Sequence, residues 1–117
     1  MKETILGLNR EMKYYFCQEA VNMGKGIDKL CGVIRDTLLR DPFSNEVFVF
    51  LSKNKKQIKI LRWNDGAFIL YTIKLYNGRY FRPEYNSSTG AFNINWDSFL
   101  SLICTYEKRN KYTKKLY

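Results

Sequence analysis

The chain has 117 residues and a mass of 14.0 kDa, enough for one hydrophobic core and too little for a multidomain enzyme. Its hydrophobic content of 45% and aromatic content of 16% exclude a disordered chain. The sequence contains no histidine, which excludes catalytic and metal sites that depend on an imidazole.

The net charge of +9 is unevenly distributed along the chain. Residues 1–46 carry seven basic and seven acidic side chains, whereas residues 47–117 carry 13 basic and four acidic ones. A one-sided positive surface attracts polyanions such as nucleic acid. A surface that only keeps the protein in solution is the alternative that composition leaves open.

The sequence predicts a cytoplasmic protein with no membrane contact, because it has neither a run of about 18 apolar residues nor the apolar stretch of a secretory signal. Cys17, Cys31 and Cys104 are an odd number and lack the spacing of metal ligands. Each lies among apolar neighbours, so we expect three buried free thiols and neither a disulfide nor a zinc site.

The first third of the chain predicts one strand and one helix. Residues 1–12 suit either a helical turn or an extended arm and give no prediction. The aromatic stretch Lys13–Cys17 favours a strand. Apolar residues then recur at helical spacing and predict an amphipathic helix over Ile27–Leu39, which Asp41-Pro42 would end.

The middle of the chain predicts a four-stranded antiparallel meander. Its strands are Val47–Leu51, Gln57–Trp63, Ala67–Tyr76 and Arg79–Arg82. Asn64-Asp65-Gly66 is typical of a hairpin connection, and Asn77-Gly78 suits a type I′ turn that would pair the fourth strand with the third.

The last third predicts a loop over Glu84–Gly90, a short strand over Ala91–Ile94, and a helix that Asn95 caps and that ends near Glu107. The expected fold is therefore α+β, an antiparallel β-meander of about four to six strands packed against two main helices. We expect a single domain over residues 1–107 and a basic, flexible tail over residues 108–117.

The sequence predicts a protein that is not an enzyme and that needs neither a cofactor nor a small-molecule substrate. Without histidine, carboxylates would have to act, and none of the eleven forms a recognisable pair. Gly24-Lys25-Gly26 before the first helix could hold a phosphate, but it lacks the length of a P-loop. A glycine turn that starts the helix is the alternative reading.

Basic residues in and around the meander are the candidate contacts to nucleic acid, with Tyr71, Tyr76, Tyr80 and Trp63 interleaved among them. We expect most aromatic residues, including Phe48, Phe50 and Phe68, to form the core instead. The candidate nucleic-acid-binding residues are Lys25, Lys53, Lys55, Lys56, Lys59, Arg62, Lys74, Arg79, Arg82, Lys108, Arg109, Lys111, Lys114 and Lys115.

Several motifs in order resemble those of one known family. They are Tyr15-Phe16-Cys17, Asn22 to Leu30, Asp41-Pro42-Phe43-Ser44 before Val47 to Phe50, Ile58 to Leu61, Trp63 to Phe68, Lys74-Leu75 and Asn77-Gly78-Arg79. The chain resembles, over roughly Tyr14 to Glu107, the TnpB accessory proteins of the IS66 family of insertion sequences, also called Orf2-like proteins.

The resemblance implies an accessory role in transposition beside a separate transposase that cuts the DNA. It assigns no catalytic residues. At the helix start the family usually reads Asp-Met-Arg-Lys-Gly, and this chain has Asn22 and Gly24 in place of the acid and the arginine. We expect either DNA binding near the ends of the element through backbone contacts or, alternatively, a protein adaptor that docks on the transposase without contacting DNA.

Overall fold

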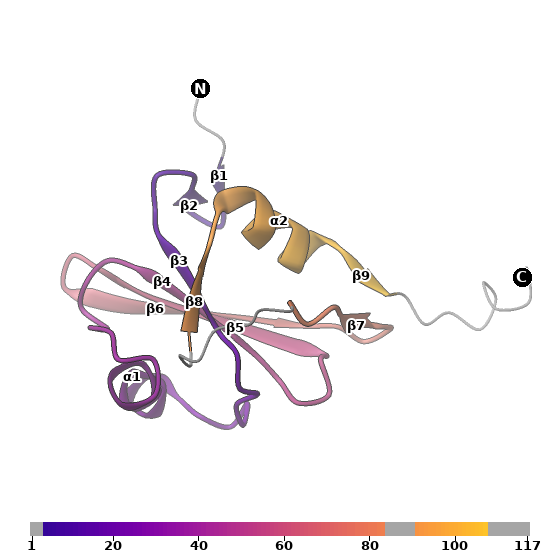
Figure 1. Ribbon diagram of the computed structural model, residues 1–117, viewed down its shortest axis with the longest axis horizontal. Coiled ribbons are helices and arrows are strands. Elements are labelled where there is room, and N and C mark those ends of the chain that lie inside the picture. Colours follow the sequence, from indigo (N-terminus) through magenta and orange to yellow (C-terminus); the bar gives the residue numbers. More distant parts are fainter. Residues whose placement is uncertain (1–3, 84–90, 108–117) are drawn as a thin grey trace, which may run out of the picture.

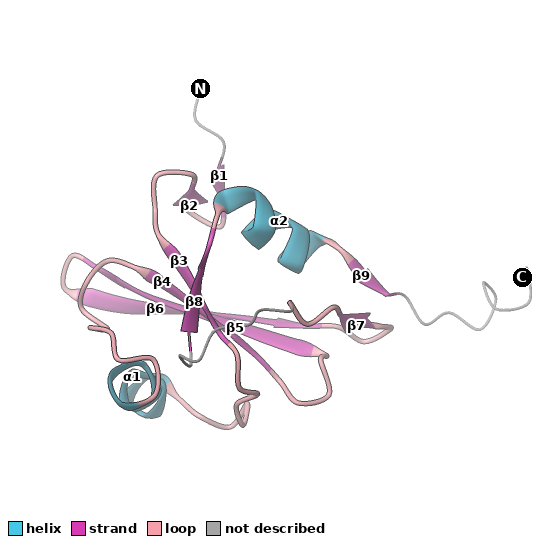
Figure 2. Ribbon diagram, viewed as in Figure 1, coloured by secondary structure: helices cyan, strands magenta, loops and turns pink. Residues whose placement is uncertain are grey.

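The protein forms a five-stranded sheet with one helix on each face (Figures 1 and 2). This computed structural model describes residues 4–83 and 91–107. The elements of the sheet and its two helices are β3 (Tyr14–Cys17), α1 (Ile27–Asp36), β4 (Val47–Leu51), β5 (Gln57–Asn64), β6 (Ala67–Lys74), β8 (Ala91–Ile94) and α2 (Trp96–Cys104). The predicted α+β class is confirmed.

The strands lie in the order β6-β5-β4-β3-β8. β4, β5 and β6 form three strands of the predicted four-stranded meander, but β3 runs parallel to β4, with Tyr14 opposite Val47. Parallel neighbours need a long crossover connection, and the segment that contains α1 supplies it. The sheet is therefore mixed rather than wholly antiparallel, because the aromatic β3 is inserted between β4 and β8.

Side chains alternate between the two faces of the sheet and build two hydrophobic clusters. On the α1 face, Leu30 and Ile34 of the helix pack with Phe48, Phe50 and Leu61 of the strands. The α2 face holds a larger cluster made of Leu8, Tyr14, Phe16, Val47, Val49, Leu51, Ile58, Ile60, Tyr80, Phe92, Ile94, Trp96, Phe99, Leu102 and Ile103. Because both faces are covered, all five residues of β4 are buried, which explains its continuous apolar run.

The hairpin between β5 and β6 has the predicted short connection. Asn64 pairs with Ala67, so the turn has only two residues, Asp65 and Gly66. Both have positive φ, 44° and 92°, as a type I′ turn requires. Phe68, predicted as core, is only half-buried beside this turn.

The predicted hairpin at Asn77-Gly78 is wrong. β7 (Arg79–Tyr80) pairs with β9 (Tyr106–Glu107) and not with β6. Gly78 has a φ of 127°, but Asn77 does not have the positive φ of a type I′ turn. The backbone N–H of Tyr80 instead donates to the Lys55 carbonyl at 2.7 Å, and its ring is buried in the α2-face cluster. Burial of this large ring gives a physical reason for β7 to leave β6.

Both predicted helices end earlier than expected. After α1 the N–H groups of Thr37 and Leu38 both donate to the Val33 carbonyl, and Leu39 adopts a left-handed φ of 56°. The chain thus leaves the helix before it reaches the Asp-Pro pair.

α2 begins as predicted, because the Asn95 side chain accepts a hydrogen bond from the Ser98 N–H at 2.7 Å. It ends at Cys104, since Thr105 is extended and leads into β9. The prediction of three buried cysteines is wrong for Cys104, which is exposed on this last turn. Cys17 and Cys31 are buried, and burial raises the pKa of both thiols.

The N-terminal region, for which no element was predicted, forms a small hairpin of β1 (Thr4–Ile5) and β2 (Leu8–Asn9). Leu8 is buried in the α2-face cluster, and the Tyr14 hydroxyl donates to the Asn9 carbonyl at 2.6 Å. Burial raises the pKa of Tyr14 to about 12. Neither helix within residues 4–83 and 91–107 has the length and hydropathy to cross a membrane.

Candidate nucleic-acid interface

The predicted basic residues occupy different environments in the structure. Nine lie in the part of the chain that the structure describes, and Lys108, Arg109, Lys111, Lys114 and Lys115 lie outside it. Of the nine, three have side chains that hold the fold together, and one lies in the turn before α1. The other five gather at one end of the sheet.

Lys59 has a structural role. It lies in the middle of β5, opposite Phe50 of β4, and is only 9% exposed. Its ammonium donates to the Lys25 carbonyl at 2.9 Å, which ties the turn before α1 to the sheet. A buried cation needs such a partner, so this ammonium is not available for a phosphate.

Arg82 also binds the backbone of its own chain. Its guanidinium donates to the carbonyl of Gln18, just after β3, at 3.1 Å and to that of Ser52, just after β4, at 3.2 Å. Because these two carbonyls end neighbouring parallel strands, Arg82 fixes the segment after β7 across them.

Arg62 and Tyr71 hold the N-terminal hairpin. The Tyr71 hydroxyl donates to the Leu6 carbonyl at 2.6 Å, and the Arg62 Nε donates to the same hydroxyl at 3.4 Å. Tyr71 is therefore engaged in the fold through its hydroxyl, and its half-buried ring packs against the α2-face cluster.

The turn before α1 is held by its own hydrogen bonds. The Asn22 side chain accepts from the Gly24 N–H at 2.7 Å, and the Asn22 carbonyl accepts from the Lys25 N–H at 3.1 Å. Gly26 caps α1 without a side-chain hydrogen bond. These contacts fit the reading of this segment as a turn that starts the helix.

The remaining five cations form what we call the basic cluster, defined as Lys53, Lys55, Lys56, Lys74 and Arg79. They come from the β4–β5 loop, the end of β6 and the start of β7, which lie together at the right of Figure 1. Three contacts join these segments: Lys74 pairs with Gln57, and the carbonyls of Lys55 and Lys56 accept from the N–H groups of Tyr80 and Leu75. Lys53, Lys74 and Arg79 are exposed, and the other two are half-buried.

The loop that carries three of these lysines is rigidly built. The Ser52 hydroxyl accepts from the N–H groups of Lys56 and Gln57 at 3.2 and 3.0 Å, and Asn54 accepts from the Lys56 N–H at 3.0 Å. Lys55 is held at a positive φ of 62°. The backbone that presents these ammonium groups is therefore fixed before any ligand binds.

One interleaved aromatic residue is free beside the basic cluster. Tyr76 lies between β6 and β7 and is 86% exposed. Tyr80, by contrast, is buried in the core, and Trp63 packs against Phe43 and Phe68 at the other end of the sheet.

Comparison with known proteins places the chain in a family. The family described as "IS66 Orf2 like protein" matches residues 12–112. The chain belongs to this family. It is also 24% identical over 99 residues to the uncharacterized protein y4jC of Sinorhizobium fredii, a match that covers 85% of this chain and 83% of that protein. No solved structure matches the chain.

The IS66 Orf2-like family is a family of accessory proteins in the transposition of insertion sequences and is not a known catalytic family, so membership implies an accessory role for the chain. Within residues 4–83 and 91–107, no three His, Cys, Asp or Glu residues gather in a way that could hold a metal ion. A groove of about 490 Å³ between β8, α2 and residues 81–83 is lined by apolar, amide and hydroxyl side chains, with Arg82 as its one charged residue.

Two motif segments of this IS66 Orf2-like chain meet in the structure, which the sequence analysis did not anticipate. Phe43 follows α1, while Trp63 and Phe68 flank the β5–β6 turn, and the three rings pack with centroids 4.9 to 5.1 Å apart. We call these three residues the aromatic cluster. Phe43 is 51% exposed. The signal in the sequence was the Asp-Pro-Phe-Ser segment, which predicted the end of a helix and carried part of the family resemblance but did not predict this contact.

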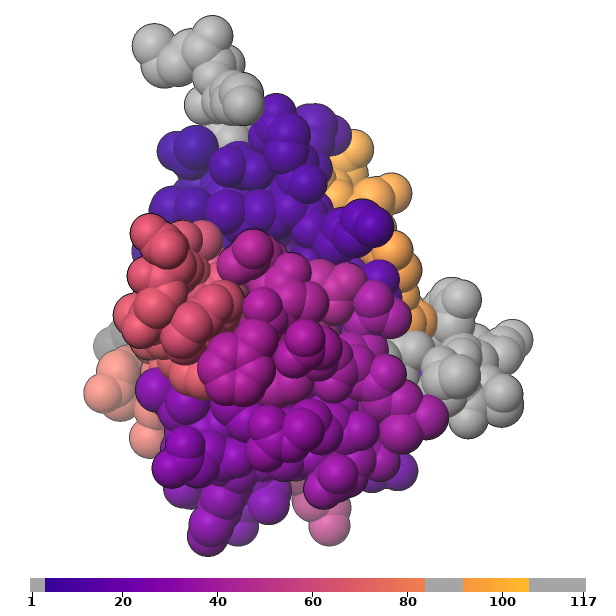
Figure 3. All heavy atoms as spheres, turned by 90° about the vertical axis from the view of Figure 1, so that its left-hand side faces the viewer, coloured from indigo at the N-terminus to yellow at the C-terminus, as the bar shows by residue number. Residues whose placement is uncertain are grey.

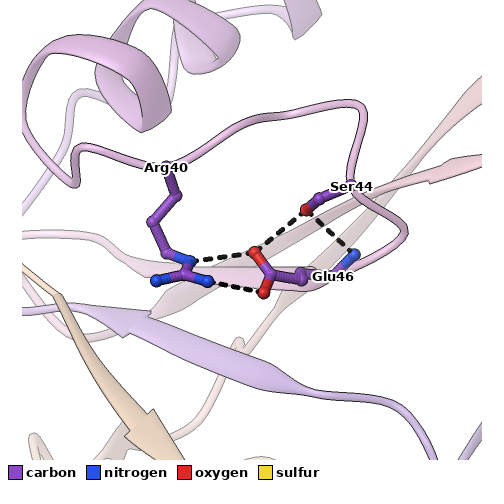
Figure 4. A network of polar contacts seen from close by, with 3 residues as sticks. All are labelled: Arg40, Ser44 and Glu46. Atoms are coloured by element: carbon purple, nitrogen blue, oxygen red, sulfur yellow. Dashed lines mark hydrogen bonds and ion pairs between the residues drawn. The ribbon is translucent and has the colours of Figure 1, made fainter.

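An ion pair anchors the segment that carries Phe43. Arg40 donates through Nε and a terminal nitrogen to both carboxylate oxygens of Glu46, at 2.8 and 2.7 Å (Figure 4). The Ser44 hydroxyl donates to the same carboxylate at 2.9 Å, and the guanidinium lies 3.9 Å from the centroid of the Tyr15 ring. Burial disfavours the charge of Glu46, but the hydrogen bonds from Arg40 and Ser44 outweigh it and lower its pKa. The same pair raises the pKa of Arg40.

Proposed function

We propose that this protein binds duplex DNA near the ends of its element through contacts to the phosphate backbone. The observation that carries the proposal is the basic cluster, in which the fold brings five cations from three separate segments to one end of the sheet. Cations that neutralise phosphates release counterions, which is the main driving force of sequence-independent DNA binding.

The pairing of β9 with β7 supports the same surface. β9 ends at Glu107, which pairs with Arg79 of the basic cluster. The chain therefore enters residues 108–117, with five basic side chains and no acidic one, at the basic end of the sheet. We include Lys108, Arg109, Lys111, Lys114 and Lys115 in the proposed interface.

The test is a salt titration of binding to a duplex from the element's end, with two matched charge variants. K53E/K74E reverses two exposed lysines of the basic cluster. K29E/R35E reverses two exposed cations of α1 and changes the net charge by the same amount. We expect affinity to fall as salt rises, with a log-log slope of about −0.9 for each neutralised phosphate.

K53E/K74E should weaken binding at least tenfold and make the slope shallower by about 2, whereas K29E/R35E should retain most of the affinity. An unmeasurable affinity of the wild type at about 50 mM salt would refute the proposal. Equal losses in the two variants would show that net charge, and not the basic cluster, drives the interaction.

A second candidate function is an adaptor that docks on the separate transposase of the element without contacting DNA. The aromatic cluster favours it, because Phe43 is half-exposed on an anchored segment where an apolar partner could cover it. The test is co-purification with that transposase after nuclease treatment. F43S should abolish it, whereas Y76S removes an exposed ring at the other end of the sheet and should not. No co-purification with the wild type would refute the adaptor.

A further inference from the structure

We infer that a second copy of this chain extends the sheet along β6, through antiparallel pairing of the two β6 strands about a two-fold axis. β6 is the outermost strand of the sheet and pairs only with β5 among the described elements. The tests of this pairing use the protein alone, so their outcome does not depend on whether the protein binds DNA or a transposase.

The type I′ turn determines which backbone groups of β6 remain available. Because Asn64 and Ala67 close the turn, residues 67, 69, 71 and 73 exchange hydrogen bonds with β5. The Leu75 N–H continues this alternation by donating to the Lys56 carbonyl at 2.8 Å. The N–H and C=O groups that face outward therefore belong to Phe68, Leu70, Thr72 and Lys74.

The β6 edge has none of the features that usually protect an exposed strand. It is eight residues long, contains no proline, and has one charged residue, Lys74, at its very end. Natural edge strands are blunted by charges, prolines, bulges or short length, and a long apolar edge pairs readily with another strand. The opposite edge of the sheet does follow this rule, since β8 has only four residues.

The side chains of β6 also remain partly open to solvent. Phe68, Leu70, Tyr71 and Ile73 are half-buried, whereas all five residues of β4 are buried. In Figure 3 the pink-red residues of this hairpin form part of the surface beside the α1–β4 segment. A neighbouring strand would cover these side chains on both faces of the sheet.

Charge does not oppose the pairing of β6 with itself. In an antiparallel pair, each Lys74 lies at the end of the strand where the partner carries Asp65 and Phe68, and the two Lys74 side chains are far apart. A two-fold axis at Tyr71 places Leu70 opposite Thr72 of the second copy and Lys74 opposite Phe68 of the second copy. The four paired residues are those whose backbone N–H and C=O groups face outward, so in this register the outward groups of each β6 strand can hydrogen-bond to those of the other.

The first test is the molecular mass of the nuclease-treated full-length chain by sedimentation, from low concentration to about 100 µM. We expect a monomer–dimer equilibrium that T72P shifts at least tenfold toward the monomer. Proline removes an outward N–H, and Thr72 does not use its N–H to bond β5. T72V keeps the N–H and should dimerise like the wild type.

Hydrogen exchange gives a second test that does not depend on a variant. The amides of Phe68, Leu70, Thr72 and Lys74 should exchange fast in the monomer and become protected as the concentration rises, whereas those of Ile69 and Tyr71 should be protected throughout. A monomer at about 100 µM would overturn the inference. A dimer in which these four amides stay unprotected, or one that T72P leaves intact, would also overturn it.

Discussion

The basic side chains of β5, β6, β7 and the loops beside them fall into two groups that the sequence does not distinguish. Lys59, Arg62 and Arg82 direct their charged groups at carbonyl or hydroxyl oxygens of the chain itself. Lys53 and Lys74 lie exposed at the end of the sheet. Each of these side chains carries one positive charge, but only those of the second group can neutralise a phosphate without weakening the fold. The two groups should therefore separate when stability and DNA binding are measured on the same variants.

The largest effect on stability is expected at Lys59. K59A should lower the free energy of unfolding by about 2–3 kcal/mol, because it leaves the Lys25 carbonyl without its partner and removes a buried stem. K59M keeps an apolar side chain of similar length, so it should lower the free energy of unfolding by about half as much as K59A. Urea denaturation measures both. If K59A lowers the free energy of unfolding by less than about 0.5 kcal/mol, Lys59 has no structural role and belongs with the exposed lysines.

A smaller loss of about 1–2 kcal/mol is expected for R82A, because two hydrogen bonds to backbone carbonyls disappear. R82K should restore only part of it, since a single ammonium lacks the planar fork that reaches both carbonyls. Thermal denaturation of the three proteins checks this order. If R82K equals the wild type, the two-carbonyl geometry contributes nothing.

The Arg40–Glu46 ion pair should make the stability of the protein depend on pH. The pKa of Glu46 is lower in the folded chain than its ordinary value of 4.5, so its contribution to stability is complete above that value and is lost as the pH falls through the folded-state pKa. E46Q should destabilise the protein by about 1 kcal/mol at neutral pH, a modest cost because Arg40 is partly solvated. Unfolding at pH 7 and pH 3 measures it, and the difference between wild type and E46Q should shrink at the lower pH.

The smallest effect on stability is expected in the basic cluster. K53A should change the free energy of unfolding by less than about 0.5 kcal/mol, because the side chain is exposed. The same variant should make the salt dependence of DNA binding shallower by about 0.9 on the log-log scale. Urea denaturation and a salt titration of one preparation test both statements. K59M should show the opposite pattern, with lower stability and an unchanged salt slope.

Sequence patterns predicted most elements because local signals determined them. The spacing of Leu30 and Ile34 defined the first helix, and Asn95 defined the start of the second. The errors came from contacts distant in sequence. Asn77-Gly78 has the local preference of a hairpin turn. Tyr80 is instead buried in the core and pairs with Tyr106, so β7 does not return along β6. No local pattern indicates that β3 lies parallel to β4 and antiparallel to β8.

The candidate site was predictable only in part. The lysines of the β4–β5 loop follow from sequence alone, because a polar loop between two apolar strands is solvated. The burial of Lys59 was not predicted. Its neighbours Ile58 and Ile60 face the α2 side of the sheet, so the alternation of side chains placed Lys59 on the opposite face, and the sequence does not indicate that this face is covered. The aromatic cluster joins residues 43 and 63, and only the folded chain brings them together.

The position of β3 between β4 and β8 has a consequence for synthesis on the ribosome. β3 lies near the start of the chain, but its outer neighbour β8 and the helix that covers it come from residues 91–104. Until those residues leave the exit tunnel, Tyr14 and Phe16 lack the rings of Phe92 and Phe99 that cover them. A gene copy cut short before the codons for residues 91–104 would therefore yield a chain that cannot close its core, so we expect such copies to be null rather than partly active.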